Sequence, residues 1–589
     1  MPDSATIPSV AARVLAAHTA HVFGIMGEGN AHFLHHAEAA GLPVTPVRHE
    51  SGAVAAADTF FRTSGKLAVA TTTYGAGFTN ALTALAESVK ARIPLVFVTG
   101  GRGNVPKPWD INEFDLLESL GVPAIGLGTA GAGAQVSNDS VGARVKRAVE
   151  MALAQSRPVA LVIPEHLVTE PAAEPSADDL ALIAPARPPI DDAALEQTVK
   201  VLTDAKRPLI LGGRGVWAAG AAQQFKNLAD VLGADLATTA AARNLWGDHP
   251  RNLGGIGGFA EDHIADRVRR ADAVLAVGTT LTPFTMRFGA SFADDATIIQ
   301  SILDDTQFHP RANITMLADA AKLGDELVAR VRAALGKREG VGATDTETSG
   351  NARGGTFESR TWPAFDGPSH WSTIVEFTPT FETEDRSTGE RVAPDIAARA
   401  LNEALPRERT VVSDGGHFLG WPTMFWEVPD PAAFVQSGTA YKCIGLATGA
   451  AAGAAYARPD RTTVLVSGDG GLQMALPDLI TFAEAPGRKI AVVFNDAGYG
   501  AEGHQFEPRS LSLTMAEIGD RDFAAIGRAL GGSGITVRRE DDIAELADWV
   551  RANPAEGFVI VDLKIRRGIA RFFEEIVQRG IAAERSPRV

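Results

Sequence analysis

The sequence predicts an α/β protein built from three consecutive domains, each with a doubly wound parallel sheet. The chain has 589 residues, which is too long for one hydrophobic core. Short apolar runs alternate with helical stretches almost throughout, which is the pattern of a parallel sheet covered by helices on both faces. Two stretches, 164–190 and 336–355, are rich in proline or in glycine and polar residues, and they separate the chain into three blocks.

The first two blocks carry the expected strands and helices in alternation. We place the first block at residues 1–170 and the second at residues 190–335. The expected strands of the first block are 21–25, 44–47, 67–71, 95–99 and 160–163, and its expected helices include 51–63 and 78–90. The second block has expected strands at 208–211, 273–277 and 297–302, and it closes with a helix over 320–335.

A stretch of unusual composition separates the last block from the second. Residues 336–391 are a linker or extension, in which 336 to about 355 indicates a solvated loop and 356–391 allows no assignment. The last block spans 392–589 and begins with a helix over 393–404. Its expected strands are 410–413, 463–467, 490–494 and 557–561.

The bulk composition indicates a soluble globular protein and excludes several classes. Hydrophobic residues make up 45% and charged residues 21%, as in an ordinary folded protein. The formal charge of −16 argues against a nucleic-acid surface, which needs a basic stripe. The single cysteine, Cys443, excludes an internal disulfide and a cysteine-based zinc site. Neither a signal peptide nor an uninterrupted apolar span is visible, so we expect no membrane partner and a cytoplasmic protein.

Two acidic turns, each at the end of an apolar strand, are the most informative feature of the chain. The first is Gly-Asp-Gly-Gly at 468–471, and the second is Asn-Asp-Ala-Gly at 495–498. Ligands bind beyond the carboxyl ends of strands in an open α/β sheet, so two adjacent turns can share one divalent cation. Magnesium usually takes only one or two carboxylates plus substrate phosphates, and Asp469, Asp496 and the carbonyl of Gly498 would supply the protein's share. Gly470 and Gly471 let the backbone approach a diphosphate.

A Gly-Asp-Gly alone is only a turn, and the second acidic turn is what favours a cation site. Together the two turns resemble the signature of the thiamine-diphosphate-dependent enzymes. That group includes acetohydroxyacid synthases, 2-oxo acid decarboxylases, pyruvate oxidases and benzaldehyde lyases. The resemblance covers nearly the whole chain and implies a pyrimidine-binding, a middle and a diphosphate-binding domain in that order. It also implies that Asp469 and Asp496 hold magnesium on the diphosphate of the cofactor.

Glu50 opens an alanine-rich helix within the run Arg48-His49-Glu50-Ser51. A glutamate in a first helical turn is often only favourable electrostatics with the helix dipole. By the resemblance, however, Arg-His-Glu supplies the glutamate that bonds the aminopyrimidine ring of the cofactor. A buried carboxyl that shares a proton with that ring favours its imino form, so Glu50 is the expected catalytic and cofactor-binding residue.

The resemblance assigns further cofactor contacts. They are Gly416, His417, Phe418, Ile444, Gly468, Asp469, Gly470, Gly471, Asp496, Gly498 and Tyr499. Ile444 has the position of the bulky apolar residue that wedges between the two cofactor rings, although plain core packing would also explain it. His417 follows a strand at the point where family members contact the diphosphate, and a solvated loop histidine is the alternative.

The substrate-facing residues give a mixed pattern. Glu28 and Glu502 lie where 2-oxo acid decarboxylases carry an aspartate and a catalytic glutamate, so both are candidate catalytic residues; ordinary exposed glutamates are the alternative. Those decarboxylases also have a His-His pair, whereas residues 100–115 contain no histidine. The run Asn-Glu-Phe-Asp at 112–115 instead resembles a motif of acetohydroxyacid synthases, and Gly-Ala-Gly-Phe-Thr-Asn at 75–80 resembles the family's Gly-Pro-Gly-x-Thr-Asn turn.

The second block contains a pattern typical of a dinucleotide-binding motif. Gly213-Arg214-Gly215 follows a strand, and Asp235 follows at the spacing of the acidic residue in that motif. Such a short pattern is frequent by chance. Some middle domains of the family bind FAD, but the paired arginines and aspartates of the flavin motif are not evident at 278–284. FAD is therefore an open alternative that the sequence does not favour.

The resemblance implies a thiamine-diphosphate- and magnesium-dependent lyase or transferase. We expect a carbon–carbon lyase or carboligase, similar to acetolactate synthase, acting on a 2-oxo acid or related carbonyl compound. A simple decarboxylase that releases an aldehyde is one alternative, and a cofactor-binding scaffold without catalysis is another. Because family members complete the site across an interface, we expect a homodimer or a dimer of dimers. The exact substrate, its acceptor and any regulatory subunit are not encoded in a recognisable motif.

Overall fold

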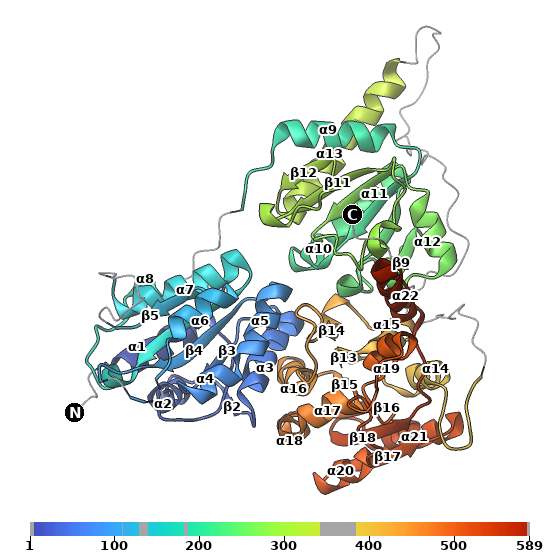
Figure 1. Cartoon of the computed structure of the whole chain (residues 1–589). Helices are drawn as coiled ribbons and strands as arrows, with labels where there is room; N and C mark the ends of the chain where they lie inside the picture. The colour runs from blue at the N-terminus through green and yellow to red at the C-terminus, as the bar shows by residue number, and fades with distance from the viewer. Residues whose placement is uncertain are drawn as a thin grey trace. The chain divides into compact units, whose positions relative to one another are not determined.

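The residues that the structure describes form three parallel six-stranded sheets, with helices between the strands (Figure 1). The computed structural model describes residues 5–105, 107–108, 110–128, 139–181, 187–341 and 385–585. The predicted fold class is confirmed, and each sheet lies within one of the three predicted blocks. The chain divides into two compact units, 1–185 with 385–422 and 435–570, and 186–384 with 423–434 and 571–589. The predicted domain boundaries stay predictions.

The first sheet has the strand order β2-β1-β3-β4-β6-β5. Its strands are β1 (Val22–Gly24), β2 (Val44–Pro46), β3 (Val69–Thr72), β4 (Leu95–Gly101), β5 (Ala124–Gly126) and β6 (Pro158–Pro164). Its helices are α1 (Ile7–His18), α2 (Ala31–Ala39), α3 (Glu50–Ser64), α4 (Ala76–Asn80), α5 (Leu82–Ala91), α6 (Glu113–Leu120), α7 (Val141–Gln155) and α8 (Ala177–Leu180). Every residue of the central strand β4 is buried, because α1 and α7 cover one face of the sheet and α3 and α5 the other.

The second sheet has the strand order β12-β11-β10-β7-β8-β9 and belongs to the other compact unit. Its strands are β7 (Pro208–Gly212), β8 (Asp235–Thr238), β9 (Asn252–Gly255), β10 (Ala273–Val277), β11 (Thr297–Ile302) and β12 (Ile314–Leu317). Its helices are α9 (Asp192–Asp204), α10 (Arg214–Ala218), α11 (Ala222–Leu232), α12 (Asp262–Arg269) and α13 (Ala320–Val341). Phe225, Trp246 and Leu323 are fully buried in the core on one face of this sheet.

The third sheet has the strand order β14-β13-β15-β16-β18-β17. Its strands are β13 (Arg409–Ser413), β14 (Phe434–Gln436), β15 (Thr462–Gly468), β16 (Arg488–Asn495), β17 (Ser533–Val537) and β18 (Gly557–Lys564). The helices of this part are α14 (Pro394–Ala404), α15 (Gly420–Phe425), α16 (Ala447–Ala457), α17 (Asp469–Met474), α18 (Leu476–Glu484), α19 (Gly500–Phe506), α20 (Phe523–Ala529) and α21 (Ala544–Ala552), followed by α22 (Arg571–Arg585). Because β15 pairs with β16 in parallel, the two acidic turns leave the sheet side by side, as predicted.

Helices α3 and α16 join the first and third sheets into one hydrophobic core (Figure 1). Both helices are rich in alanine and glycine, so their backbones approach closely. A Cβ atom added at Gly449 would lie 2.6 Å from the Cα of Gly52, and one added at Gly453 would lie 2.6 Å from the Cα of Ala56. Glycine is therefore required at these two positions by packing rather than by backbone conformation.

Several predicted elements differ from the structure in informative ways. The expected helix 78–90 is divided into α4 and α5, which meet at Ala81. The expected linker 164–190 contains a short helix, α8, held by a capping box between Ser176 and Asp179. The expected loop from 336 is wrong at its start, because α13 continues to Val341; the remainder up to 384 lies outside the described residues. The strands β10 and β11 have the predicted bounds.

We predict that Gly453→Ala lowers the free energy of unfolding by about 1–3 kcal/mol, because its Cβ would overpack the α3–α16 contact. Gly336→Ala is the matched control: Gly336 is exposed on α13, and an added Cβ meets no atom within 4 Å. The control should raise stability by about 0.5–1 kcal/mol, since alanine is the better helix former. Urea unfolding of both variants measures the difference. Equal effects at both positions would contradict the packing argument.

Candidate functional site

Asp469 and Asp496 lie at the carboxyl ends of the neighbouring strands β15 and β16. Both residues are buried, with exposed fractions of 2% and 9%. Among the described residues, Oδ2 of Asp469 and Oδ2 of Asp496 accept no hydrogen bond. Burial first, and then the neighbouring Asp496 carboxylate, raise the pKa of Asp469 to about 7. Nε of Arg567 lies 3.4 Å from Oδ2 of Asp496, whereas no cationic side chain is paired with Asp469 among the described residues, so a bound cation would complete the site.

The two carboxylates are the acidic part of this candidate cation site. No group of three or more His, Cys, Asp or Glu side chains suited to a metal occurs in the part of the chain that the structure describes. A magnesium ion here would take its other oxygens from the backbone, such as the Gly498 carbonyl, and from a bound phosphate or water. The chemistry of the donor set therefore fits a magnesium–diphosphate pair better than a free metal ion.

Glycines keep the two acidic turns in close contact. A Cβ atom at Gly470 would lie 2.7 Å from Cδ1 of Tyr499, so the ring of the second turn lies directly against the first. A Cβ atom at Gly498 would lie 2.7 Å from the carbonyl oxygen of Ala516. Ala497 between Asp496 and Gly498 has φ of 65°, in the left-handed region that an alanine seldom adopts. At Gly470 and Gly498 the close contacts therefore leave no room for a side chain.

The segment after β13 lies beside the acidic turns. His417 is buried, and its Nε2 atom is 3.7 Å from Oδ2 of Asp496, so it is not the solvated loop histidine of the alternative interpretation. Its ring meets His504 edge-on at 5.0 Å, and burial first, then His417, lower the pKa of His504 to about 4. The Phe418 ring stacks on Phe494 and lies against Gly468.

Asp414 is a buried acidic residue of this site that the sequence analysis missed. Its carboxylate accepts hydrogen bonds from the backbone amide of Gly445, at 2.9 and 3.1 Å, and from the Ser467 hydroxyl at 3.2 Å. A Cβ atom at Gly471 would lie 2.5 Å from Oδ2 of Asp414. Asp414 thus ties the half-buried Ile444 segment to the first acidic turn. Its position directly after β13, like that of Asp469 after β15, was the available signal.

Glu50 is the first residue of α3, and the structure places it against the turn that follows β3. Asn80 donates a hydrogen bond from Nδ2 to Oε2 of Glu50 at 3.0 Å, and a Cβ atom at Gly77 would lie 3.2 Å from Oε1. The helix is capped by His49, whose Nδ1 accepts from the Ser51 amide. Among the described residues, no hydrogen bond or ion pair joins Glu50 to Asp469 or Asp496.

Glu28 lies at the same edge of the first sheet, where Tyr74 holds it. The Tyr74 hydroxyl donates to Oε2 of Glu28 at 2.5 Å, and this bond is the main reason that the pKa of Tyr74 is raised to about 12. The ring lies against Gly29 and Gly100, and Lys107 lies over it at 5.7 Å. No local sequence pattern predicts the Tyr74–Glu28 bond, because the two residues are far apart in the chain.

The remaining candidate residues are Glu502 and those of the dinucleotide-like pattern. Glu502 is exposed on α19, which begins four residues after Asp496. In the second sheet, the carboxylate of Asp235 accepts two hydrogen bonds from Arg267, at 2.7 and 3.0 Å. A Cβ atom at Gly215 would lie 2.7 Å from the Cα of Gly278, so this glycine is explained by close packing. The residues of the dinucleotide-like pattern therefore have structural roles.

Comparisons with known proteins match all three blocks. The N-terminal TPP binding domain of thiamine pyrophosphate enzymes matches residues 6–107, the central domain matches 195–327 and the C-terminal TPP binding domain matches 414–563. The chain belongs to the thiamine pyrophosphate enzymes. Glu50 lies in the N-terminal match, and Asp469 and Asp496 lie in the C-terminal match. The cofactor is therefore thiamine diphosphate, the same compound as thiamine pyrophosphate.

Curated relatives of this thiamine pyrophosphate enzyme have several activities. Acetolactate synthase of Mycobacterium leprae is 26% identical, over 86% of this chain and 78% of the relative. Sulfoacetaldehyde acetyltransferase of Alcaligenes xylosoxydans xylosoxydans is also 26% identical, over 89% and 86%. The 2-hydroxyacyl-CoA lyase 2 of Danio rerio is 23% identical, over 92% and 88%.

No helix among the described residues is long and apolar enough to cross a membrane.

We predict a pH-dependent stability difference between the wild type and Asp414→Asn. Burial raises the pKa of Asp414 from 3.8 to about 6. The pKa of Asp414 is higher in the folded state than in the unfolded state. The contribution of this carboxyl to stability is therefore complete below about pH 4 and is lost as the pH rises through 6. The stability of Asp414→Asn relative to the wild type should therefore increase by up to about 3 kcal/mol between pH 4 and pH 7.

Urea unfolding of the cofactor-free proteins at several pH values measures this difference. The same measurement on Asp541→Asn, at an exposed aspartate, is the control for the general effect of replacing an aspartate by asparagine. A constant difference for Asp414→Asn across the pH range would contradict the assigned burial effect.

Proposed function

We propose that this thiamine pyrophosphate enzyme is a magnesium-dependent carbon–carbon lyase or carboligase of the acetolactate synthase type, acting on a 2-oxo acid or a related carbonyl compound. One observation carries the proposal: Asp469 and Asp496 lie buried at adjacent strand ends, and each has an oxygen that accepts no hydrogen bond. The names of the relatives support a reaction that makes or breaks a bond next to a carbonyl.

The residues that would hold the cofactor follow from the site. Asp469, Asp496 and the carbonyl of Gly498 would bind magnesium. The backbone of the first turn would meet the diphosphate, because glycines expose it there. Ile444, fixed through Asp414, would pack against the cofactor rings. The other proposed contacts are Gly416, His417, Phe418, Gly468, Gly470, Gly471 and Tyr499.

When bound, thiamine diphosphate supplies a carbon nucleophile that attacks a carbonyl carbon and takes up the electron pair of the bond that breaks. Glu50 would hold and exchange a proton at the aminopyrimidine ring, and Asn80 orients the carboxylate by bonding Oε2. Glu28, held by the Tyr74 hydroxyl, would move a proton or orient the carboxylate group of the substrate. Glu502 is the second acid proposed for this role.

A simple 2-oxo acid decarboxylase is the second candidate function. The two acids Glu28 and Glu502 favour it, whereas the absence of histidine from residues 100–115 disfavours it. A cofactor-binding scaffold without catalysis is disfavoured by the presence of Glu50 beside Asn80. FAD in the middle domain is also disfavoured, because Arg267 occupies the carboxylate of Asp235.

We further propose a homodimer or dimer of dimers in the cytoplasm. The absence of any bond between Glu50 and Asp469 or Asp496 within the described chain supports a site that takes Glu50 from one protomer and the acidic turns from its partner.

The proposed activity is tested by supplying purified protein with a panel of 2-oxo acids, with and without thiamine diphosphate, magnesium and an aldehyde acceptor. Release of carbon dioxide that requires both cofactors, with carbon–carbon coupling to the acceptor, supports the proposal. Free aldehyde as the only product would favour the decarboxylase. Cofactor binding without any product from carbonyl substrates would contradict both enzymes.

We predict that Glu50→Gln and Asp469→Asn are each at least about 100-fold less active than the wild type, since each removes one half of the site. A mixed dimer of the two variants has one site with both residues intact. Random reassociation should therefore recover about a quarter of the wild-type activity. Mass spectrometry of the intact dimers verifies the mixing. Mixed dimers without recovered activity would contradict the shared site.

A further inference from the structure

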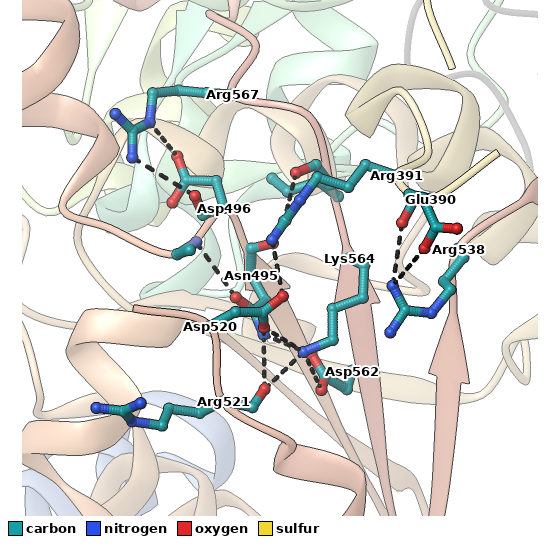
Figure 2. Close-up of polar contacts among 12 residues, drawn as sticks. Glu390, Arg391, Asn495, Asp496, Asp520, Arg521, Arg538, Asp562, Lys564 and Arg567 are labelled. Carbon is teal, nitrogen blue, oxygen red and sulfur yellow. Dashed lines mark hydrogen bonds and ion pairs between the residues drawn. The ribbon is translucent and has the colours of Figure 1, made fainter. Parts of the chain in front are cut away.

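Asn495, the last residue of β16, fixes the turn that carries Asp496 (Figure 2). Its side chain is fully buried, and its amide nitrogen donates to Asp562 at 2.9 Å, to Asp520 at 3.2 Å and to the Arg521 carbonyl at 3.1 Å. Its amide oxygen accepts from the backbone of Ala497 at 3.2 Å. The backbone of Ala497 is in the left-handed region, which is unfavourable for alanine. This conformation therefore depends on contacts such as the hydrogen bond to Asn495.

The side chain of Arg391 donates a hydrogen bond to the main chain of Asn495 (Figure 2). One guanidinium nitrogen donates to the carbonyl of Asn495 at 2.9 Å and to the carbonyl of Ile565 at 3.0 Å. The other nitrogen donates to Asp520 at 2.8 Å. Asn495 is the last residue of β16, and Ile565 directly follows β18, which is paired with β16 at Asn495 and Lys564. Arg391 therefore links the ends of β16 and β18, and the turn that carries Asp496 begins at the end of β16.

The segment around Arg391 is itself held in place by the backbone. Val392 donates to the carbonyl of Lys564 at 2.9 Å, and Arg566 donates to the carbonyl of Val392 at 3.0 Å. The Ala393 amide donates to the hydroxyl of Ser387 at 2.9 Å. Residues 385–393 thus form a short cap over the ends of β16 and β18. The sequence pattern of residues 356–391 allows no assignment, and the structure shows that residues 385–391 belong to this cap.

We propose that Arg391 is a positioning residue for magnesium binding. Its guanidinium holds the Asn495 carbonyl, so that the following Asp496 carboxylate stays beside Asp469. Magnesium demands near-ideal octahedral ligands, and residues that orient its ligands affect affinity strongly. The planar fork of arginine contacts three acceptors at once, which lysine cannot reproduce. The proposal rests on the proposed role of Asp496 as a magnesium ligand.

Calorimetric titration of full-length, cofactor-free protein with thiamine diphosphate, at a series of magnesium concentrations, tests this role. Arg391→Gln should raise the magnesium concentration needed for half-maximal binding by roughly tenfold or more, with full stoichiometry restored at high magnesium. Arg391→Lys should show a smaller increase.

The matched control is Arg538→Gln. Arg538 bonds the carbonyl and the carboxylate of Glu390, the neighbour of Arg391, at 3.3 and 3.4 Å (Figure 2). Neither of those two bonds involves Asn495, so its magnesium dependence should match that of the wild type. An equal shift in Arg538→Gln would show that the cap as a whole matters, and it would overturn the specific role of Arg391.

Asp496→Asn separates this proposal from the one on which it rests. If Asp496→Asn loses magnesium-dependent binding while Arg391→Gln retains the wild-type dependence, the Arg391 role is overturned and the metal site stands. If Asp496→Asn binds as the wild type does, the metal site itself is overturned. Should Arg391→Gln fail to fold, Arg391→Lys carries the test, and a wild-type magnesium dependence of the folded lysine variant overturns the proposal.

Discussion

The close placement of two buried carboxylates at neighbouring strand ends is the constraint on which the candidate site depends. Burial first, and then the neighbouring Asp496 carboxylate, raise the pKa of Asp469 to about 7, while Nε of Arg567 lies 3.4 Å from Oδ2 of Asp496. Each carboxylate has an oxygen that accepts no hydrogen bond. A protein keeps such an arrangement at a cost in stability, which is typical of a site that a ligand completes.

The surrounding structure is arranged to hold these two acids. Asp414 links the Ile444 segment to the first turn, and Asn495 holds the second turn through three hydrogen bonds from its amide nitrogen. Glycines such as Gly470 remove the side chains that would separate the turns. On the first sheet, Glu50 is held by Asn80 beside a glycine-containing turn. Both halves of the proposed site therefore consist of a functional carboxylate and a short turn that orients it.

The sequence was sufficient for the parts of the fold and site that depend on local patterns. Buried strands such as 273–277 are continuous apolar runs, and the acidic turns are recognisable because they follow such runs. It was not sufficient for short edge strands such as β5, whose residues are half-buried and give no clear pattern. Nor did it show the Tyr74–Glu28 and Arg391–Asn495 bonds, since these join residues that only the folded chain brings together.

Electron paramagnetic resonance with Mn²⁺ in place of Mg²⁺ tests the shared magnesium–diphosphate site. Two carboxylates and the Gly498 carbonyl supply only part of an octahedral shell, and the proposed site takes further oxygens from the diphosphate. We expect one bound Mn²⁺ per chain when thiamine diphosphate is present, and no binding at the same concentration when it is omitted. Mn²⁺ that binds equally well without thiamine diphosphate, or that fails to bind with it, would contradict a shared magnesium–diphosphate site at Asp469 and Asp496.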